Sequence, residues 1–198
     1  MDGPGKNLWL ISVSSTLLSF TVTTKILTRF INQGRWWAIR PVKGGVWNNM
    51  LFPNKGINWW LQKYKYMYYR GAGYGIGRKI LPYQTLVSIA PENPRDADYI
   101  LDECCKYELE RDPNFVGYEV NVSCPNTKKI PFESIIEIVK IVSGGSVDEY
   151  AENYATILKL NYQQAFYSSG FSDVELSRFL PYVDGVALNS APKWCILW

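Results

Sequence analysis

The chain contains no histidine. This absence excludes serine–histidine and cysteine–histidine triads, histidine general bases and most zinc sites. A group that transfers a proton in this protein must therefore be a cysteine, lysine, tyrosine, aspartate or glutamate side chain. We expect no metal site.

Cysteine is also scarce, and the four cysteines show no CxxC spacing. Cys104 and Cys105 are adjacent within a helical pattern, which predicts that both are packing residues. So few cysteines, with no disulfide framework, are typical of a reducing compartment, and we expect a cytoplasmic protein.

Two further features are missing: a long apolar run and a concentration of charge of one sign. The apolar stretch 8–22 contains several serines and threonines. It falls short of the ~20 residues that span a bilayer, so it predicts a buried strand and no membrane association. The net charge of +3 is small and the basic residues are scattered, which predicts no nucleic-acid partner. With 47% hydrophobic residues among 198, we expect one globular domain.

From residue 84 onward, strand and helix patterns alternate along the chain. We expect strands over 85–90, 115–123, 155–160 and 185–189, and helices over 94–110, 131–142 and 172–179. Alternation of this length is typical of parallel βαβ units, whose functional residues gather at the carboxyl ends of the strands.

The first eighty residues are less regular. Strands are expected over 8–14 and 20–28, but the intervening segment is too short for the helical crossover that joins parallel neighbours. A polar, glycine-rich loop is expected over 33–49 and an amphipathic helix over 57–66. This part of the chain therefore departs from a regular βαβ pattern.

A glycine-rich run follows at 71–77, but it does not fit G-x-G-x-x-G and no strand precedes it. We interpret it as a loop. The alternative is a nucleotide-binding site, which would depend on Gly73 and Gly75.

The most informative stretch is YEVNVSCPN, residues 118–126. Apolar residues alternate through this expected strand, and Pro125 ends its pairing because proline has no N–H. Cys124 therefore lies just past a strand end, between the carboxamides of Asn121 and Asn126. A thiol has a pKa near ~8.5 and is a better base where nearby donors stabilise the thiolate.

The string NVSCPN, with an acidic residue two places before its first asparagine, resembles the active-site segment of the soluble, cysteine-using dihydroorotate dehydrogenases. In that family the cysteine is the catalytic base, and the two asparagines hold the pyrimidine and the flavin. The resemblance implies these roles for Cys124, Asn121 and Asn126.

Four further segments resemble the same family in the same order. They are Thr24-Lys25, which is similar to a TK pair; 45–56, similar to G-x-x-N-x-M-G-L-P-N-x-G; 157–160, similar to a V-K-L strand; and 188–190, similar to an N-[ST] pair.

The resemblance assigns these segments to two sets of contacts. The residues expected to hold the flavin are Ser15, Lys25, Asn121 and Lys159. Those expected to hold the pyrimidine and its carboxylate are Asn48, Met50, Leu51, Asn121, Asn126, Asn189 and Ser190. Two of them depart from the family pattern, because Ser15 and Leu51 replace glycines and add bulk where the backbone approaches a ligand.

The resemblance implies that residues 1–198 form a single FMN-binding domain with a (β/α) TIM barrel fold. The barrel is expected to be incomplete, with about six of eight strands. The implied reaction is oxidation of dihydroorotate to orotate in pyrimidine biosynthesis, with fumarate or a nicotinamide coenzyme as final oxidant. The implied partners are a small-molecule substrate and a second copy in a homodimer. Two alternatives remain: a related dihydropyrimidine dehydrogenase, or a truncated homologue that holds no flavin and acts as a binding or assembly module.

Overall fold

The computed structural model describes residues 11–12, 21–35, 37–43, 45–48, 53–67, 83–123, 130–144, 154–161 and 171–189. In this part of the chain the fold is α/β, as expected. A six-stranded sheet has the order β1-β2-β5-β6-β7-β8. Its strands are β1 (Ile11–Ser12), β2 (Thr21–Thr23), β5 (Gln84–Ile89), β6 (Phe115–Asn121), β7 (Ala155–Asn161) and β8 (Gly185–Asn189).

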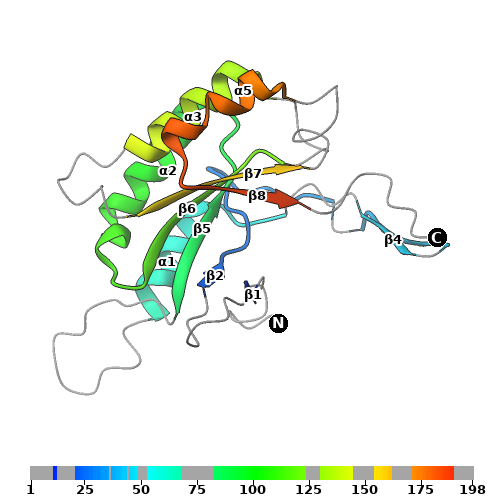
Figure 1. Ribbon diagram of the computed structural model, residues 1–198. Helices are drawn as coiled ribbons and strands as arrows, with labels where there is room; N and C mark the ends of the chain where they lie inside the picture. The colour runs from blue at the N-terminus through cyan, green and yellow to red at the C-terminus, as the bar shows by residue number, and fades with distance from the viewer. Residues whose placement is uncertain are drawn as a thin grey trace.

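Strands β2, β5, β6, β7 and β8 pair in parallel and form a curled sheet, while β1 pairs antiparallel with β2 (Figure 1). The antiparallel pair explains the short connection between the first two strands, because antiparallel neighbours need no crossover helix. The described sheet therefore has five parallel strands rather than about six.

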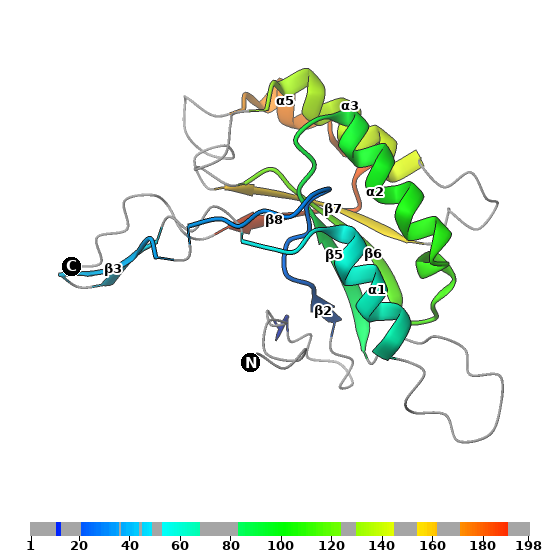
Figure 2. The same cartoon turned by 180° about the vertical axis from the view of Figure 1, so that it is seen from behind.

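The helices lie along one face of this sheet (Figures 1 and 2). They are α1 (Ile57–Met67), α2 (Pro94–Lys106), α3 (Phe132–Gly144) and α5 (Asp173–Ser177), with 3-10 turns η1 (Leu109–Arg111) and η3 (Leu180–Tyr182). Among the described residues, no helix combines the length and apolar character needed to cross a membrane.

A two-stranded hairpin, β3 (Ile39–Val42) and β4 (Gly45–Asn48), occupies the segment expected to be a loop. The expectation was wrong because the proline and glycines of this segment resemble those of an irregular loop, whereas here they lie in and beside a short antiparallel pair. In both views the hairpin extends away from the main sheet (Figures 1 and 2).

The core lies between the sheet and the helices. Tyr118 and Val120 of β6 and Leu158 and Leu160 of β7 are buried in it. Because side chains alternate across a strand, the residues between them, Glu119 on β6 among them, face the other side of the sheet. The apolar alternation expected for β6 therefore separates a packed face from a polar one.

Gly117 marks an irregularity in β6. The β5–β6 register shifts at this point, so that Thr85 lies opposite Phe115 and Leu86 opposite Gly117. Gly117 has φ +150°, and a Cβ added to it would collide with the backbone carbonyl oxygen of Ala155 on β7. Only glycine allows the two strands to approach this closely.

We predict that Gly117→Ala lowers the free energy of unfolding by ~3 kcal/mol, because the methyl group meets backbone atoms that cannot move aside cheaply. Urea unfolding would measure the loss. Gly144→Ala is the matched control, since a Cβ there meets nothing within 4 Å, and its stability should stay within ~1 kcal/mol of the parent chain. Equal stability of the two variants would contradict the close approach of β6 and β7.

Candidate functional site

Polar side chains gather on the sheet face opposite the helices, toward the carboxyl ends of the central strands. Ser88 of β5 lies opposite Glu119 of β6, and two residues further on Asn121 of β6 lies opposite Lys159 of β7. The parallel register thus places four hydrogen-bonding side chains from three strands in two adjacent rows.

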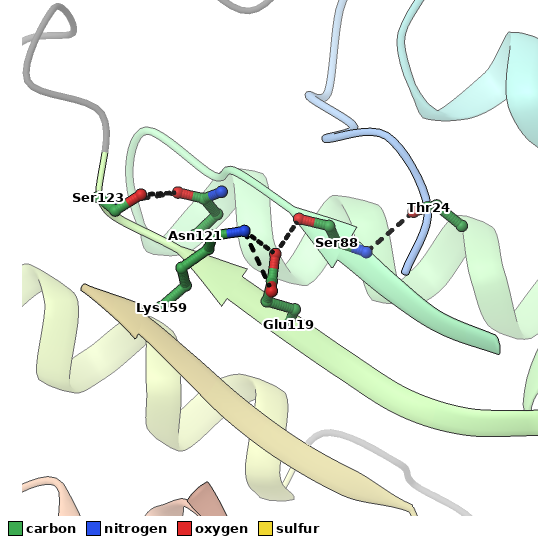
Figure 3. A network of polar contacts seen from close by, with 6 residues as sticks. All are labelled: Thr24, Ser88, Glu119, Asn121, Ser123 and Lys159. Carbon is green, nitrogen blue, oxygen red and sulfur yellow. Dashed lines mark hydrogen bonds and ion pairs between the residues drawn. The ribbon is translucent and has the colours of Figure 1, made fainter. Parts of the chain in front are cut away.

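Glu119 is at the centre of this cluster and is only 5% exposed. Its carboxylate accepts a hydrogen bond from the Ser88 hydroxyl at 2.6 Å and contacts Lys159 Nζ at 3.2 and 3.3 Å (Figure 3). Buried carboxylates are costly unless they are paired and hydrogen-bonded, and both conditions are met here.

Ser88 is itself held in place by Thr24, the residue that follows the neighbouring strand β2. Its backbone N–H donates to Thr24 Oγ1 at 3.0 Å, and both residues are buried. Thr24, Ser88, Glu119 and Lys159 therefore form one continuous chain of contacts across the sheet (Figure 3). Such a chain fixes the orientation of the carboxylate.

Lys159 lies in a strand whose alternate residues are buried, and the side chain of Lys159 is 17% exposed. A lysine in an apolar strand is costly unless it is paired, and the partner here is Glu119. An ammonium group has three N–H donors. Both contacts go to one carboxylate, so at least one donor can serve a further acceptor.

Asn121 shapes the chain where β6 ends. Its Oδ1 accepts from the backbone N–H of Ser123 at 3.1 Å and from the Ser123 hydroxyl at 2.7 Å, while Asn161 Nδ2 donates to the Ser123 carbonyl at 3.1 Å. This is a local side-chain turn of the kind asparagine favours. The carboxamide oxygen of Asn121 is therefore committed to the turn, and its NH2 group is the part suited to a ligand.

Apart from Lys25, the other predicted residues divide into two groups. Ser15, Met50, Leu51, Cys124, Asn126 and Ser190 lie outside the described residues. Asn48 and Asn189 are described by their backbone, with Asn189 ending β8 opposite Asn161. Asn48 is the last residue of β4, and the β3–β4 hairpin extends away from the main sheet in both views (Figures 1 and 2).

Lys25 is exposed, directly after the buried Thr24. No hydrogen bond or ion pair between described residues joins Lys25 to the Glu119–Lys159 cluster. The structure therefore brings together Asn121 and Lys159 of the predicted set, and it leaves Lys25 at the surface.

Glu119 and Ser88 were not among the predicted site residues. The sequence carries a signal for Glu119: an acidic residue within an apolar-alternating strand is costly unless a cation lies nearby. Lys159 gives the same kind of signal, because it is a charged residue in an apolar strand 40 positions later. The two signals indicate that each side chain needs a partner, and the structure shows that they are partners of each other. Ser88 offers no comparable signal, since serine is common in strands of any function.

A cavity of about 480 Å³ lies elsewhere, between the segment after β2 and the start of α2. Its lining includes Thr28, Arg29, Asn32, Ala90, Asn93 and Asp96. Arg29 pairs with Asp96 at 3.1 Å, and the Asn93 side chain caps α2 by accepting from the Asp96 N–H. Of the predicted site residues that the structure describes, none lines this cavity.

The two described cysteines differ sharply. Cys104 is fully buried beside Tyr118, and burial raises the pKa of its thiol to about 12. Cys105 is exposed, so the expectation that both cysteines are packing residues was wrong for Cys105. The helix turns by about 100° per residue, and adjacent positions face different surroundings.

The cluster offers a cation, a carboxamide NH2 group and a fixed carboxylate at the carboxyl ends of parallel strands. This donor set is suited to the polar edge of a planar, anionic or polarised ring. Within the described residues, no group of three histidine, cysteine, aspartate or glutamate side chains could hold a metal ion. No model of a known protein family matches the chain, and neither does any curated protein.

We predict that Lys159→Met and Glu119→Gln each lower the free energy of unfolding by ~3 kcal/mol, because each leaves a buried charge without its partner. The double variant should lose clearly less than the sum of the two. Urea unfolding of all four proteins forms the double-mutant cycle. Lys106→Met, which removes the exposed ion pair with Glu103 on α2, is the control and should be nearly neutral. Additive losses would mean that the two buried groups are not coupled.

We also predict that iodoacetamide at pH 8 modifies Cys105 of the folded protein at least ~100-fold faster than Cys104, whose raised pKa and burial leave almost no accessible thiolate. Peptide mass spectrometry over time would measure both rates. In urea the two rates should converge. Rapid modification of Cys104 in the folded protein would contradict its burial.

Proposed function

We propose that this chain is a flavin-dependent dehydrogenase of the dihydroorotate dehydrogenase type, built on a partial (β/α) barrel, which oxidises dihydroorotate to orotate. The observation that carries the proposal is the β6–β7 register, in which Asn121 lies opposite Lys159. Two separate segments that resemble this family thus meet at the carboxyl edge of one parallel sheet, where α/β enzymes bind their ligands.

The chain's own residues have distinct roles in the proposed reaction. The Cys124 thiolate takes the proton from C5 of dihydroorotate and becomes a thiol. The C5–C6 double bond forms as the hydride leaves C6. When bound, FMN would supply the hydride acceptor, with fumarate or a nicotinamide coenzyme as final oxidant, and Asn121 and Lys159 would hold its ring.

The donor set of the cluster fits the polar edge of a flavin ring. Lys159 has at least one N–H donor beyond its contacts with Glu119, and Asn121 has a carboxamide NH2 group beside it. A cation at this edge stabilises the negative charge that builds there on reduction. Lys159 would therefore hold the ring electrostatically, and Asn121 would orient it.

The choice between dihydroorotate and a related dihydropyrimidine depends on the carboxylate-binding segment around Asn48, with Asn126, Asn189 and Ser190 completing the pyrimidine contacts. The proposal places the protein in cytoplasmic pyrimidine biosynthesis, as a homodimer.

A second candidate function is a binding or assembly module that holds no flavin. Two observations favour it: Lys25 is exposed, and the hairpin that ends at Asn48 extends away from the sheet. In addition, Glu119 already balances the charge of Lys159, so the cluster needs no anionic ligand to be stable.

We predict that the purified protein binds FMN and that dihydroorotate bleaches the flavin absorbance band anaerobically. Cys124→Ala should retain FMN and lower the bleaching rate by ~10²–10⁴-fold, because the base is gone. Stopped-flow absorbance would measure the rate.

Cys105→Ala is the matched control, since Cys105 is exposed on α2, and its bleaching rate should equal that of the parent chain. Bleaching by Cys124→Ala at the parent rate would remove Cys124 from the role of base. Colourless protein that takes up no added FMN would support the second candidate instead.

A further inference from the structure

Glu119 takes no part in the proposed proton and hydride transfers, yet it is the best-fixed charged group of the cluster. Its side chain is 6% exposed, and three contacts hold its carboxylate: one from Ser88 and two from Lys159. A carboxylate placed beside the cation of a site has a chemical effect whether or not it touches the ligand.

The geometry decides which way that effect acts. Lys159 lies one row nearer the carboxyl edge of the sheet than Glu119, because Lys159 is opposite Asn121 while Glu119 is opposite Ile157. The ammonium is drawn back toward Glu119 from the edge where a ring would bind. A ligand at that edge therefore meets a cation whose charge is partly balanced from behind.

We infer that Glu119 is a positioning residue that moderates the positive charge Lys159 presents to the flavin ring. This inference rests on the proposed function, since it requires a flavin next to Lys159. Glu119 acts through Lys159 and does not touch the ring. Without the carboxylate, the ammonium would carry its full charge toward the ring and favour any form of the flavin with negative charge at N1.

Ser88 and Thr24 support this role by fixing the carboxylate. The Ser88 hydroxyl occupies one carboxylate oxygen at 2.6 Å, and the Ser88 backbone is tied to Thr24 at 3.0 Å. The hydrogen bond from the Ser88 hydroxyl is made to Oε1, the same oxygen that Lys159 Nζ contacts at 3.2 Å, and it limits how far the carboxylate can follow the ammonium toward the edge. The contacts between the strands therefore fix how far Glu119 balances the charge of Lys159.

Sulfite is the probe for this charge, because sulfite adds to N5 of an oxidised flavin and leaves negative charge at N1, so its affinity reports the cation nearby. We expect Glu119→Gln to lower the sulfite dissociation constant of the FMN-loaded protein at least ~10-fold, the size expected for an uncompensated charge at short range. Lys159→Met should raise that constant by a similar factor. The midpoint potential should move opposite to that constant, rising for Glu119→Gln and falling for Lys159→Met, by ~30 mV for each tenfold change.

Two further variants separate position from charge. Glu119→Asp keeps the charge but shortens the side chain, so its sulfite dissociation constant should fall only ~2–3-fold, between the parent chain and Glu119→Gln. Glu137→Gln, at an exposed position on α3, is the matched control for removal of a carboxylate and should stay within ~2-fold of the parent.

Different outcomes of these measurements test the role of Glu119 and the proposed flavin chemistry. If Glu119→Gln shifts sulfite affinity equally with Lys159 present and with Lys159→Met, Glu119 does not act through Lys159 and the inference fails. If FMN binds and is bleached but neither Glu119→Gln nor Glu119→Asp changes sulfite affinity, the inference fails while the proposed function stands. Should Glu119→Gln not fold, Glu119→Asp alone decides, and an unchanged constant overturns the inference. A protein that takes up no FMN overturns both.

Discussion

The pairing of β6 with β7 is the constraint on which the rest of the structure depends. In a parallel pair the register decides which side chains share a row, and a shift by one residue would exchange the two faces of the strand. Here the register buries Tyr118 and Leu158 against the helices and leaves Glu119, Asn121 and Lys159 on the other face. Core and polar cluster are thus two consequences of one alignment.

The polar cluster is a compromise between stability and chemistry. An apolar pair of similar volume at positions 119 and 159 would avoid the desolvation of two charges, and such replacements are often neutral or stabilising. A buried ion pair is therefore weak evidence for a purely stabilising role. Its location at the carboxyl edge of a parallel sheet, next to a carboxamide, is where a ligand-binding function is expected.

The sequence predicted the α/β class and most elements after residue 84, and the bounds of β8 were predicted without error. The alternating and helical periodicities of those segments are strong local signals. The β3–β4 hairpin was missed because its strands contain Pro41 and flanking glycines, which are typical of loops. The pairing of Lys159 with Glu119 could not be read from the sequence alone, because the register of two strands separated by a helix is a tertiary property. The sequence showed that Lys159 needs a partner, and only the register identified it.

The contact between Thr24 and Ser88 joins positions 64 residues apart, the largest separation among the strand pairs of this sheet. Closing a loop of that length costs roughly 4 kcal/mol of chain entropy. Non-local pairings of this kind are slow to form, whereas β5 to β8 associate through shorter connections. Glu119 therefore gains the support of Thr24, through Ser88, only when β2 pairs with β5. The polar cluster is complete only after this pairing, which joins the segments of the sheet that lie farthest apart in the sequence.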